Sequence, residues 1–143
     1  MDLYAGSGAV GLEAMSRGAA QVSFVEHGPA ALKVLRANLG KLGISQGFAI
    51  HCVSAGALLR KPPTGQGFDV VFLDPPYEAA EEYSSTLGLL GGAAVGLLAP
   101  GAVVIAEHRR KQPLGLHYGV LERTRLKEQG DAALSFYAVA DAE

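Results

Sequence analysis

Short apolar runs alternate with helix-length segments along most of the chain, and this alternation limits the fold more than any other feature. The runs that predict strands are residues 1–4, 21–26, 47–53, 69–73 and 102–107. The intervening segments that predict helices are residues 10–17, 29–42, 55–59 and about 78–98. Residues 116–127 and 132–139 predict an antiparallel pair around a turn at Gln129-Gly130-Asp131. We therefore expect a doubly wound α/β fold with a mostly parallel sheet and an antiparallel C-terminal hairpin.

The length and composition suit one domain with a hydrophobic core. The chain has 143 residues, 49% of them hydrophobic, and no repeat or linker divides it, so we predict a single domain over residues 1–143. The net charge of −2 excludes a strongly basic nucleic-acid-binding chain. The one cysteine, Cys52, excludes an internal disulfide and a zinc site built from cysteines. We expect no metal.

Two features bear on the cell compartment. The acidic N-terminus lacks the basic region and apolar run of a signal peptide, which favours the cytoplasm. The uncharged residues 84–106 are numerous enough for a membrane span. Pro100-Gly101 interrupts them, however, and the β-branched residues that follow are typical of a buried strand. We interpret the stretch as a helix followed by a strand, with no membrane partner.

A glycine-rich turn near the start of the chain is the first motif that points to chemistry. Gly6-x-Gly8-x-x-Gly11 follows a predicted strand and opens a predicted helix, where glycines let a ligand approach the backbone, although tight packing of the turn is an alternative. Glu26 ends the next predicted strand and is suited to bind the hydroxyls of a ribose. Asp2 precedes the glycines, and a carboxylate there suits the cationic amino group of S-adenosylmethionine better than the pyrophosphate of NAD. The motif favours S-adenosylmethionine as the cofactor.

The second motif is Asp74-Pro75-Pro76-Tyr77, directly after a predicted strand. Its two prolines fix φ and remove two amide donors, which leaves carbonyl groups and the Asp74 carboxylate as acceptors. Tyr77 adds a flat aromatic face. Acceptors beside an aromatic ring suit a planar base with an exocyclic amine, whereas the alternative is a stiff turn in which Asp74 caps the next helix.

These motifs resemble one enzyme family. The stretch D-L-Y-A-G-S-G-A-V-G-L-E-A-M-S-R-G-A, which begins at Asp2, together with F-V-E and D-P-P-Y, is similar to the bacterial small-subunit ribosomal-RNA guanine-N2 methyltransferases, the RsmD family. The similarity extends to G-D-A-A-L-S-F-Y near the C-terminus. It implies a seven-stranded, Rossmann-like S-adenosylmethionine methyltransferase sheet. The strand that carries Asp2 is central in such a sheet, so we expect the chain to be N-terminally incomplete and to lack most of this strand.

The resemblance also implies roles for individual residues. The methionine part of S-adenosylmethionine would be lined by Asp2, Ala5, Gly6, Ser7 and Gly8. The ribose would be bound by Glu26, and the adenine would lie beside His27 and near Ser54, where many methyltransferases place an Asp or Asn. The catalytic pocket for the target base would consist of Asp74, Pro75, Pro76 and Tyr77.

The implied reaction is enzymatic transfer of a methyl group from S-adenosylmethionine to the exocyclic N2 amine of a guanine in 16S ribosomal RNA. In-line displacement would leave S-adenosylhomocysteine as the product. The implied partner is 16S rRNA within an assembled small-subunit particle, with a monomer favoured. Two alternatives stay open: an amino-methyltransferase that acts on adenine or cytosine in DNA, and a catalytically silent nucleoside-binding module.

Two basic groups occur in the C-terminal half. His108-Arg109-Arg110-Lys111 follows a predicted strand and fits either a contact with RNA phosphates or an ordinary solvated loop. Arg123, Arg125 and Lys127 alternate along another predicted strand, which would place all three on one face.

Overall fold

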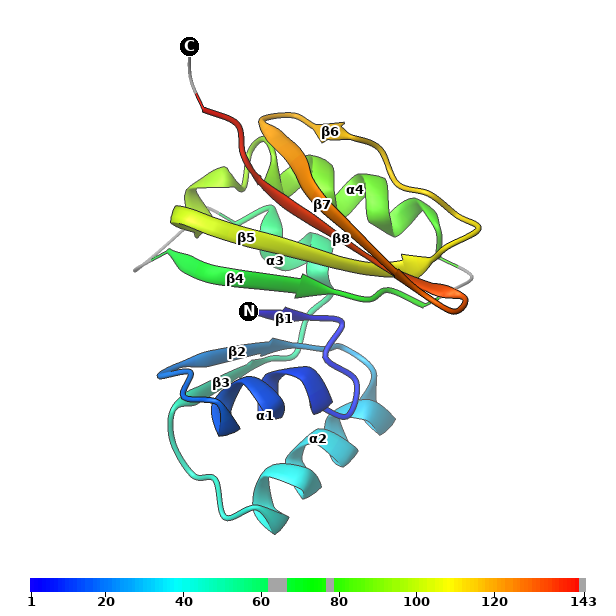
Figure 1. Cartoon of the computed structure of the whole chain (residues 1–143). Coiled ribbons are helices and arrows are strands. Elements are labelled where there is room, and N and C mark those ends of the chain that lie inside the picture. Colours follow the sequence, from blue (N-terminus) through cyan, green and yellow to red (C-terminus); the bar gives the residue numbers. More distant parts are fainter. Residues whose placement is uncertain (62–66, 77–78, 142–143) are drawn as a thin grey trace. The chain divides into compact units, whose positions relative to one another are not determined.

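The computed structural model describes residues 1–61, 67–76 and 79–141 (Figure 1). The chain forms two compact units, Met1–Leu58 and Leu59–Glu143. Both units combine strands with helices, so the predicted α/β class is confirmed.

The first unit contains three parallel strands and two long helices. Its elements are β1 (Asp2–Leu3), α1 (Ala9–Ser16), β2 (Val22–Val25), α2 (Pro29–Lys41) and β3 (Phe48–His51), and α3 (Ala55–Leu59) follows at its end. β2 lies between β1 and β3 and pairs with both in parallel, with Asp2 opposite Phe24 and Val25 opposite His51. The carboxyl ends of β1 and β2 therefore lie at the same edge, and ligands of such sheets bind there.

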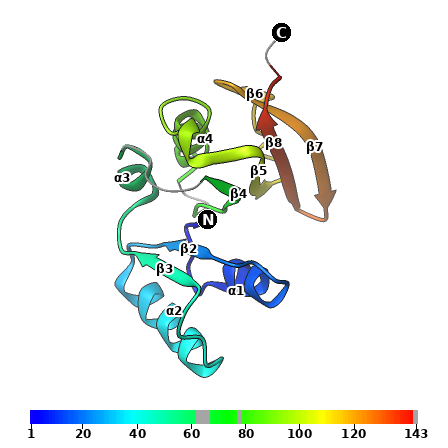
Figure 2. The same ribbon diagram turned by 90° about the vertical axis from the view of Figure 1, so that its left-hand side faces the viewer.

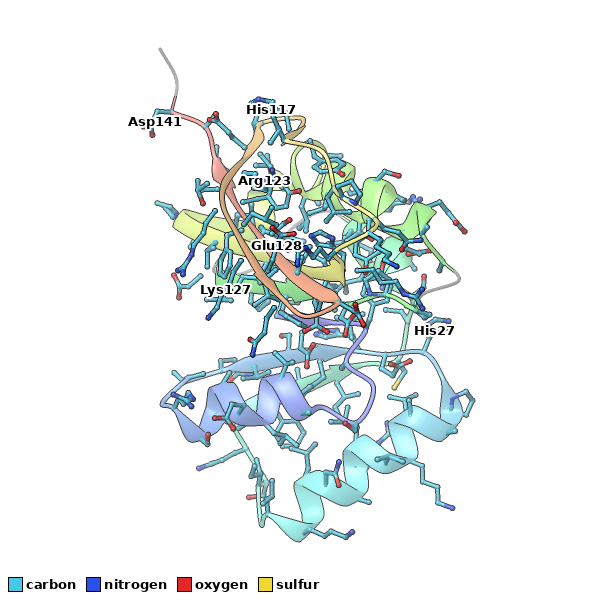
Figure 3. The ribbon with its side chains drawn as sticks, turned by 45° about the vertical axis from the view of Figure 1, so that its right-hand side comes forward. His27, His117, Arg123, Lys127, Glu128 and Asp141 are labelled. Carbon is cyan, nitrogen blue, oxygen red and sulfur yellow. The ribbon has the colours of Figure 1, made fainter. Side chains whose placement is uncertain are left out.

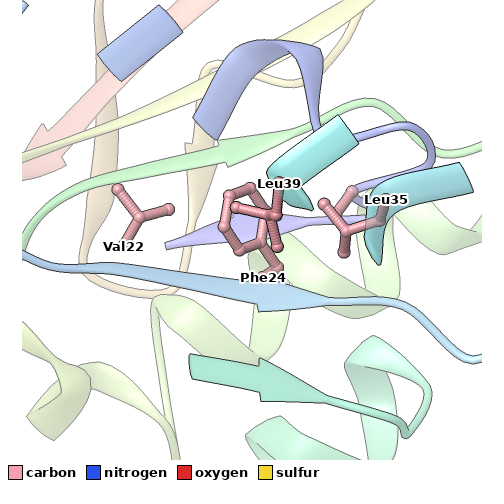
Figure 4. Close-up of a cluster of buried hydrophobic side chains, with 5 residues drawn as sticks. Val22, Phe24, Leu35 and Leu39 are labelled. Carbon is pink, nitrogen blue, oxygen red and sulfur yellow. The ribbon is translucent and has the colours of Figure 1, made fainter. Parts of the chain in front are cut away.

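The core of the first unit lies between β2 and α2. Figure 4 shows Val22 and Phe24 of the strand against Leu35 and Leu39 of the helix. Phe24 also meets Phe48 of β3 edge to face, with ring centroids 6.4 Å apart. Since burial of each large apolar side chain contributes about 1.5–3 kcal/mol, this cluster holds β2 and α2 together. The leucine spacing that predicts a helix over residues 29–42 marks the buried side of α2.

The second unit is built from a parallel strand pair extended by an antiparallel hairpin. Its elements are β4 (Phe68–Leu73), α4 (Glu81–Leu90), the 3-10 helix η1 (Val95–Leu97), β5 (Leu98–Arg109), β6 (His117–Tyr118), β7 (Leu121–Gln129) and β8 (Ala132–Val139). The strand order within the unit is β4-β5-β8-β7-β6. β4 and β5 are parallel, and the other pairs are antiparallel, as expected for the C-terminal hairpin.

The helix α4 covers one face of the strands of this second unit (Figures 1 and 2). α4 buries Tyr83, Leu87 and Leu90, and alternate residues of β5 and β8 are buried as well. Two of these buried residues, His108 and Ser135, are polar. A polar pair in such a position needs hydrogen-bond partners, and they are described with the site.

Two predicted elements are shorter than expected, and a single contact explains both. The helix expected over residues 78–98 ends at Leu90, and the strand expected over residues 116–127 is divided into β6 and β7. Gly91 and Gly119 lie backbone to backbone at these breaks, so closely that a Cβ on either would run into the main chain of the other segment. The amide of Val120 donates to the carbonyl oxygen of Gly91 at 2.9 Å. The division of this strand adds one short strand to the seven that the sequence predicts.

The uncharged residues 84–106 form parts of α4, η1 and β5, which agrees with the interpretation as a helix followed by a strand. Within the described part of the chain, no helix combines the length and the apolar character needed to cross a membrane.

The prediction that Arg123, Arg125 and Lys127 share one face is wrong. A β-bulge lies between Arg123 and Arg125, so that Arg123 pairs with Tyr137 while Arg125 pairs with Phe136. Tyr137 and Phe136 are consecutive and face opposite sides of the sheet. Arg125 accordingly stacks over the Phe136 ring, 5.6 Å from its centroid. Figure 3 shows Arg123 and Lys127 along β7. The extra residue of the bulge, which the sequence does not reveal, separates the basic side chains.

Candidate active site

The three positions of the first motif are occupied by glycine for different physical reasons. Gly6 and Gly8 adopt left-handed φ angles of 57° and 86° in the loop between β1 and α1. A side chain at Gly8 would run into Leu35, and one at Gly11 would run into Phe24, so these two glycines serve packing. A Cβ at Gly6, in contrast, would meet no atom within 4 Å. The structure thus leaves open space over Gly6, where a ligand can approach the backbone.

Asp2 is buried at the start of β1 and binds the first turn of α1. Its Oδ2 accepts a hydrogen bond from the amide of Gly11 at 3.1 Å. Burial disfavours the charged carboxylate and raises the pKa of Asp2 to about 6, although the Gly11 hydrogen bond acts in the opposite direction. A cationic group beside this carboxylate would restore its charge. The contact with Gly11 also gives Asp2 a structural task that the sequence alone does not predict.

Glu26 fixes the shape of the glycine loop. Its Oε1 accepts a hydrogen bond from the amide of Gly6 at 2.8 Å, and its Oε2 accepts from the amides of His27 at 3.0 Å and Gly28 at 2.9 Å. A carboxylate has about four acceptor positions, so three amide bonds leave room for a hydroxyl group. Glu26 therefore holds the loop and remains suited to a ribose.

The remaining cofactor candidates surround this loop or follow β3. The carbonyl oxygen of Ser7 accepts a hydrogen bond from Asn38 Nδ2 at 3.0 Å, and the carbonyl oxygen of Ala5 accepts one from the Gly8 amide at 2.8 Å. His27 is exposed, and Figure 3 shows it at the surface. Ser54 Oγ accepts a hydrogen bond from the Ala57 amide at 3.1 Å, which makes it the cap of α3.

The donor and acceptor set of the first unit fits S-adenosylmethionine. The space over Gly6 lies next to a carboxylate with acceptor capacity, because the Gly6 amide is bound to Glu26. Asp2, in the neighbouring strand β1, supplies a second carboxylate. Two carboxylates suit a ligand that carries ribose hydroxyls and a cationic amino group, and they disfavour a pyrophosphate.

The second motif follows β4 in the other unit. Asp74 is exposed directly after Leu73, Pro75 is buried, and Pro76 is exposed. The carbonyl oxygen of Pro76 accepts a hydrogen bond from the Ala79 amide at 3.0 Å. Tyr77, the fourth residue of the predicted pocket, lies outside the described residues.

Asp74 is part of a pocket of about 510 Å³ within the second unit. The pocket lies where β5 ends and β8 begins, and its lining consists of Asp74, Glu107–Arg109, Lys111–Gln112 and Asp131–Ala132. Three carboxylates and two cationic side chains thus share one cavity. Acceptors and cations in this combination suit a nucleotide, because the base carries N–H groups and the phosphate is an anion.

His108 and two side chains of β8 were not predicted to organise this pocket. His108 Nε2 lies 2.8 Å from Ser135 Oγ, and the Tyr137 hydroxyl donates to the carbonyl oxygen of Gly115 at 2.7 Å. Burial raises the pKa of Tyr137 to about 12, with the nearby Tyr118 acting in the same direction. The part of the sequence that could have pointed to Ser135 and Tyr137 is the stretch G-D-A-A-L-S-F-Y. Both side chains face the core.

The structure therefore groups the predicted residues into two sets. Asp2, Gly6 and Glu26 come together in the first unit, and Asp74 lies in the pocket of the second. Among the described residues, no group of three or more His, Cys, Asp or Glu side chains is arranged to hold a metal ion.

Known proteins are similar in sequence to this chain over most of its length. The family model described as "Conserved hypothetical protein 95" matches residues 1–138. "Putative rRNA methyltransferase YlbH" of Bacillus subtilis is 30% identical over 138 residues, 96% of this chain and 73% of that protein. "Ribosomal RNA small subunit methyltransferase D" of Haemophilus influenzae is 36% identical over 118 residues. This match covers 80% of the chain but only 58% of the relative.

Solved structures share the fold. "Putative methyltransferase yhhF" from Escherichia coli has a TM-score of 0.82 at 31% identity, over 95% of this chain and 73% of that one. A ribosomal protein L11 methylase from Lactobacillus delbrueckii has a TM-score of 0.73 over 98% of this chain and 68% of that one. At 16% identity, the second match bears on the fold alone. The predicted Rossmann-like methyltransferase fold is confirmed.

Proposed function

Because the chain belongs to the RsmD-type family described as Conserved hypothetical protein 95, matched over residues 1–138, we propose that it transfers a methyl group from S-adenosylmethionine to the exocyclic N2 amine of a guanine in 16S rRNA. The observation that carries this proposal is the pocket at the end of β5, with the Asp74 carboxylate in its lining. Relatives named as rRNA methyltransferases support the RNA substrate.

The first unit binds and orients the cofactor in this proposal. The ribose hydroxyls bind the acceptor position that three amides leave on Glu26. The loop residues Ala5, Gly6, Ser7 and Gly8 line the methionine part, and Asp2 faces its amino group. His27 and the Ser54 region accommodate the adenine. S-adenosylmethionine supplies an electrophilic methyl group when bound, and the chain's own residues supply position.

The second unit holds the base. Asp74 and the Pro75 carbonyl accept hydrogen bonds from the guanine N2 amine, which turns its lone pair toward the methyl group. Pro76 stiffens the backbone, and Tyr77 stacks on the base. As the new N–C bond forms, the sulfur–methyl bond of the donor would break to leave S-adenosylhomocysteine. The amine would lose a proton, which can pass to water because Asp74 is exposed. Positioning and electrostatics provide most of the rate gain.

The target guanine must leave its stack or lie in an exposed loop to enter such a pocket. The substrate we propose is 16S rRNA within an assembled small-subunit particle, with the enzyme acting as a monomer.

A methyl-transfer assay with radiolabelled S-adenosylmethionine tests the proposal. Small-subunit particles, naked 16S rRNA and duplex DNA serve as parallel substrates, and the labelled nucleoside is identified after digestion. We expect N2-methylguanosine from the RNA substrates. Label in adenine or cytosine of DNA would support the DNA alternative instead, and cofactor binding without transfer to any substrate would support a silent binding module.

The role of Asp74 is tested with Asp74→Ala and the matched Asp74→Asn. The alanine variant removes both acceptor oxygens, so we expect transfer to fall about 10²–10³-fold. Asn keeps one acceptor oxygen and should retain part of the activity. Cofactor affinity, measured by calorimetry with S-adenosylhomocysteine, should stay largely unchanged in both variants. A parallel loss of cofactor affinity would contradict the assignment of Asp74 to the substrate base.

A further inference from the structure

The segment that links β5 to β6 combines exposed side chains with a firmly held backbone. Arg109, Arg110, Lys111 and Gln112 are all exposed. Loops of this kind are ordinarily mobile because few buried groups hold them. Here, however, two buried side chains, His108 of β5 and Tyr137 of β8, direct hydrogen bonds to the carbonyl groups of this one segment.

His108 holds the start of the segment. Its Nδ1 lies 2.9 Å from the carbonyl oxygen of Arg109 and 3.0 Å from that of Gln112. Carbonyl oxygens only accept, so Nδ1 carries the proton and donates to both. In the neutral ring, Nε2 accepts the hydrogen bond from the buried Ser135 hydroxyl. The ring thus fixes a tight turn over Arg109–Gln112 to the middle of β8.

Further contacts hold both sides of the segment. The Arg110 amide donates to the carbonyl oxygen of Asp131 at 2.8 Å, at the hairpin turn. The Tyr137 hydroxyl donates to the carbonyl oxygen of Gly115 at 2.7 Å. Tyr83, whose ring meets His108 edge to face, donates through its hydroxyl to the carbonyl oxygen of Glu107. Buried polar groups with satisfied hydrogen bonds make a structure rigid and specific, so the turn is preorganised.

The turn forms one wall of the pocket that contains Asp74, and it carries the cationic charge of that pocket. Arg109 and Lys111 are lining residues, whereas Arg110 is paired with Glu128 at 2.7 Å. Lys111 takes part in no ion pair within the described part of the chain. The three carboxylates of the pocket, Asp74, Glu107 and Asp131, lie outside Arg109–Gln112, so an anion binds most favourably on the side of this turn.

We propose that Arg109–Gln112 is the RNA-phosphate-binding wall of the substrate pocket, in which Lys111 contacts a phosphate beside the target base and His108 is the positioning residue that holds the wall. This inference rests on the proposed function, because the phosphate belongs to the RNA strand whose guanine enters the pocket. It adds a point of attachment for the strand to the acceptors that hold the base.

Binding of RNA tests the inference separately from methyl transfer. The probe is a fluorescein-labelled single-stranded RNA oligonucleotide that contains guanine, and its anisotropy is measured over a series of salt concentrations. Loss of one phosphate contact lowers the slope of log K against log salt by about 0.7 for a single strand. We expect this change and weaker binding for Lys111→Gln. The matched control Lys127→Gln removes the same charge from β7, outside the pocket lining, and should bind as the wild type does.

Two His108 variants test the positioning role. The side-chain amide of Asn reaches about as far as Nδ1 and donates to the same carbonyl oxygens, whereas Leu fills similar space without a donor. We expect His108→Leu to weaken RNA binding as Lys111→Gln does and His108→Asn to restore most of it. In methyl transfer, His108→Leu should raise KM for RNA more than it lowers kcat, with the affinity for S-adenosylhomocysteine unchanged. If His108→Leu does not fold, His108→Asn and Lys111→Gln decide the question.

Three results would overturn the inference: wild-type RNA binding in Lys111→Gln, an equal loss in Lys127→Gln, or His108→Asn binding no better than His108→Leu. Absence of RNA binding by the wild-type chain would overturn it as well. If Lys111 matters for binding but no methyl group reaches RNA, the proposed function fails and the RNA site stands. If RNA is methylated but Lys111→Gln binds RNA as the wild type does, the inference alone fails.

Discussion

Replacement of Asp2 by asparagine should change how the stability of the chain depends on pH. The Asp2 carboxyl is 4% exposed, and burial raises its pKa from 3.8 to about 6. Asparagine keeps an oxygen that can accept the hydrogen bond from the Gly11 amide, and it cannot ionise. The comparison of Asp2→Asn with the wild type therefore isolates the ionisation of this one group.

The direction follows from proton linkage. The folded state binds the Asp2 proton more tightly than the unfolded state does, so this group contributes stability below about pH 4 that is lost as the pH rises through about 6. At about 1.4 kcal/mol for each pKa unit, the loss amounts to about 3 kcal/mol at neutral pH. Asp2→Asn does not suffer this loss. Its free energy of unfolding should therefore gain about 3 kcal/mol relative to wild type between about pH 4 and about pH 7.5.

Urea unfolding of both proteins across this pH range measures the difference. Other titrating groups are shared and cancel, and any constant cost of the buried amide group appears equally at every pH. Carboxyl carbon NMR gives the pKa of Asp2 directly. A difference that stays constant with pH, or a measured pKa at or below the ordinary value for Asp, would refute the reasoning. Bound S-adenosylmethionine should lower the pKa, because the amino group favours the carboxylate.

Three further changes have expected outcomes. Gly11→Ala forces a Cβ into the Phe24 ring and should lower the free energy of unfolding by about 1–3 kcal/mol, measured by urea unfolding. Glu26→Ala removes the acceptor for three loop amides, so calorimetry should detect no binding of S-adenosylhomocysteine, while a fully folded variant that still binds would contradict this role. Tyr137→Phe loses the hydrogen bond to Gly115, which should cost about 1 kcal/mol, and ultraviolet titration should lose the phenol that ionises near pH 12.

Local patterns predicted the elements whose stability is local. The helix over residues 29–42 is observed as Pro29–Lys41, because its leucines repeat every three or four residues and face one strand. Gly6 and Gly8 likewise lie in the turn between β1 and α1, and Gly11 lies in the first turn of α1, as expected for a strand–turn–helix motif. In both cases, the residues that determine the structure are close in the sequence, so propensity and periodicity suffice.

Long-range contacts decided the elements that the sequence misplaced. Gly91 and Gly119 each weaken a regular element locally, but only their approach in space explains why the helix and the strand both end there. The bulge between Arg123 and Arg125 depends on the pairing of β7 with β8, which periodicity along one strand does not contain. A pattern of alternating basic residues therefore overstates a basic face whenever a bulge shifts the register.

The candidate site shows the same division between what local sequence reveals and what it conceals. Asp74 follows a strand, and its place at a ligand edge could be predicted from the parallel order alone. His108 belongs to a basic segment of the sequence. The alternation of buried and less buried residues along β5 is what buries its ring while the cationic side chains beside it are exposed. The connection from His108 to Ser135 spans 27 positions and becomes visible only when β8 is placed beside β5.

The two acidic residues beside the glycine motif have structural roles in addition to their proposed roles in ligand binding. Asp2 accepts a hydrogen bond from the Gly11 amide in the first turn of α1, and Glu26 accepts one from the Gly6 amide in the loop before it, so the open space over Gly6 depends on a loop that these bonds shape. A loss of cofactor binding in an alanine variant of either residue therefore combines a changed loop with a lost ligand contact. At Asp2, the asparagine variant keeps the acceptor for Gly11 and separates the two. At Glu26, glutamine would turn an amide donor toward Gly6 or toward His27 and Gly28, so no isosteric substitution there leaves the loop intact.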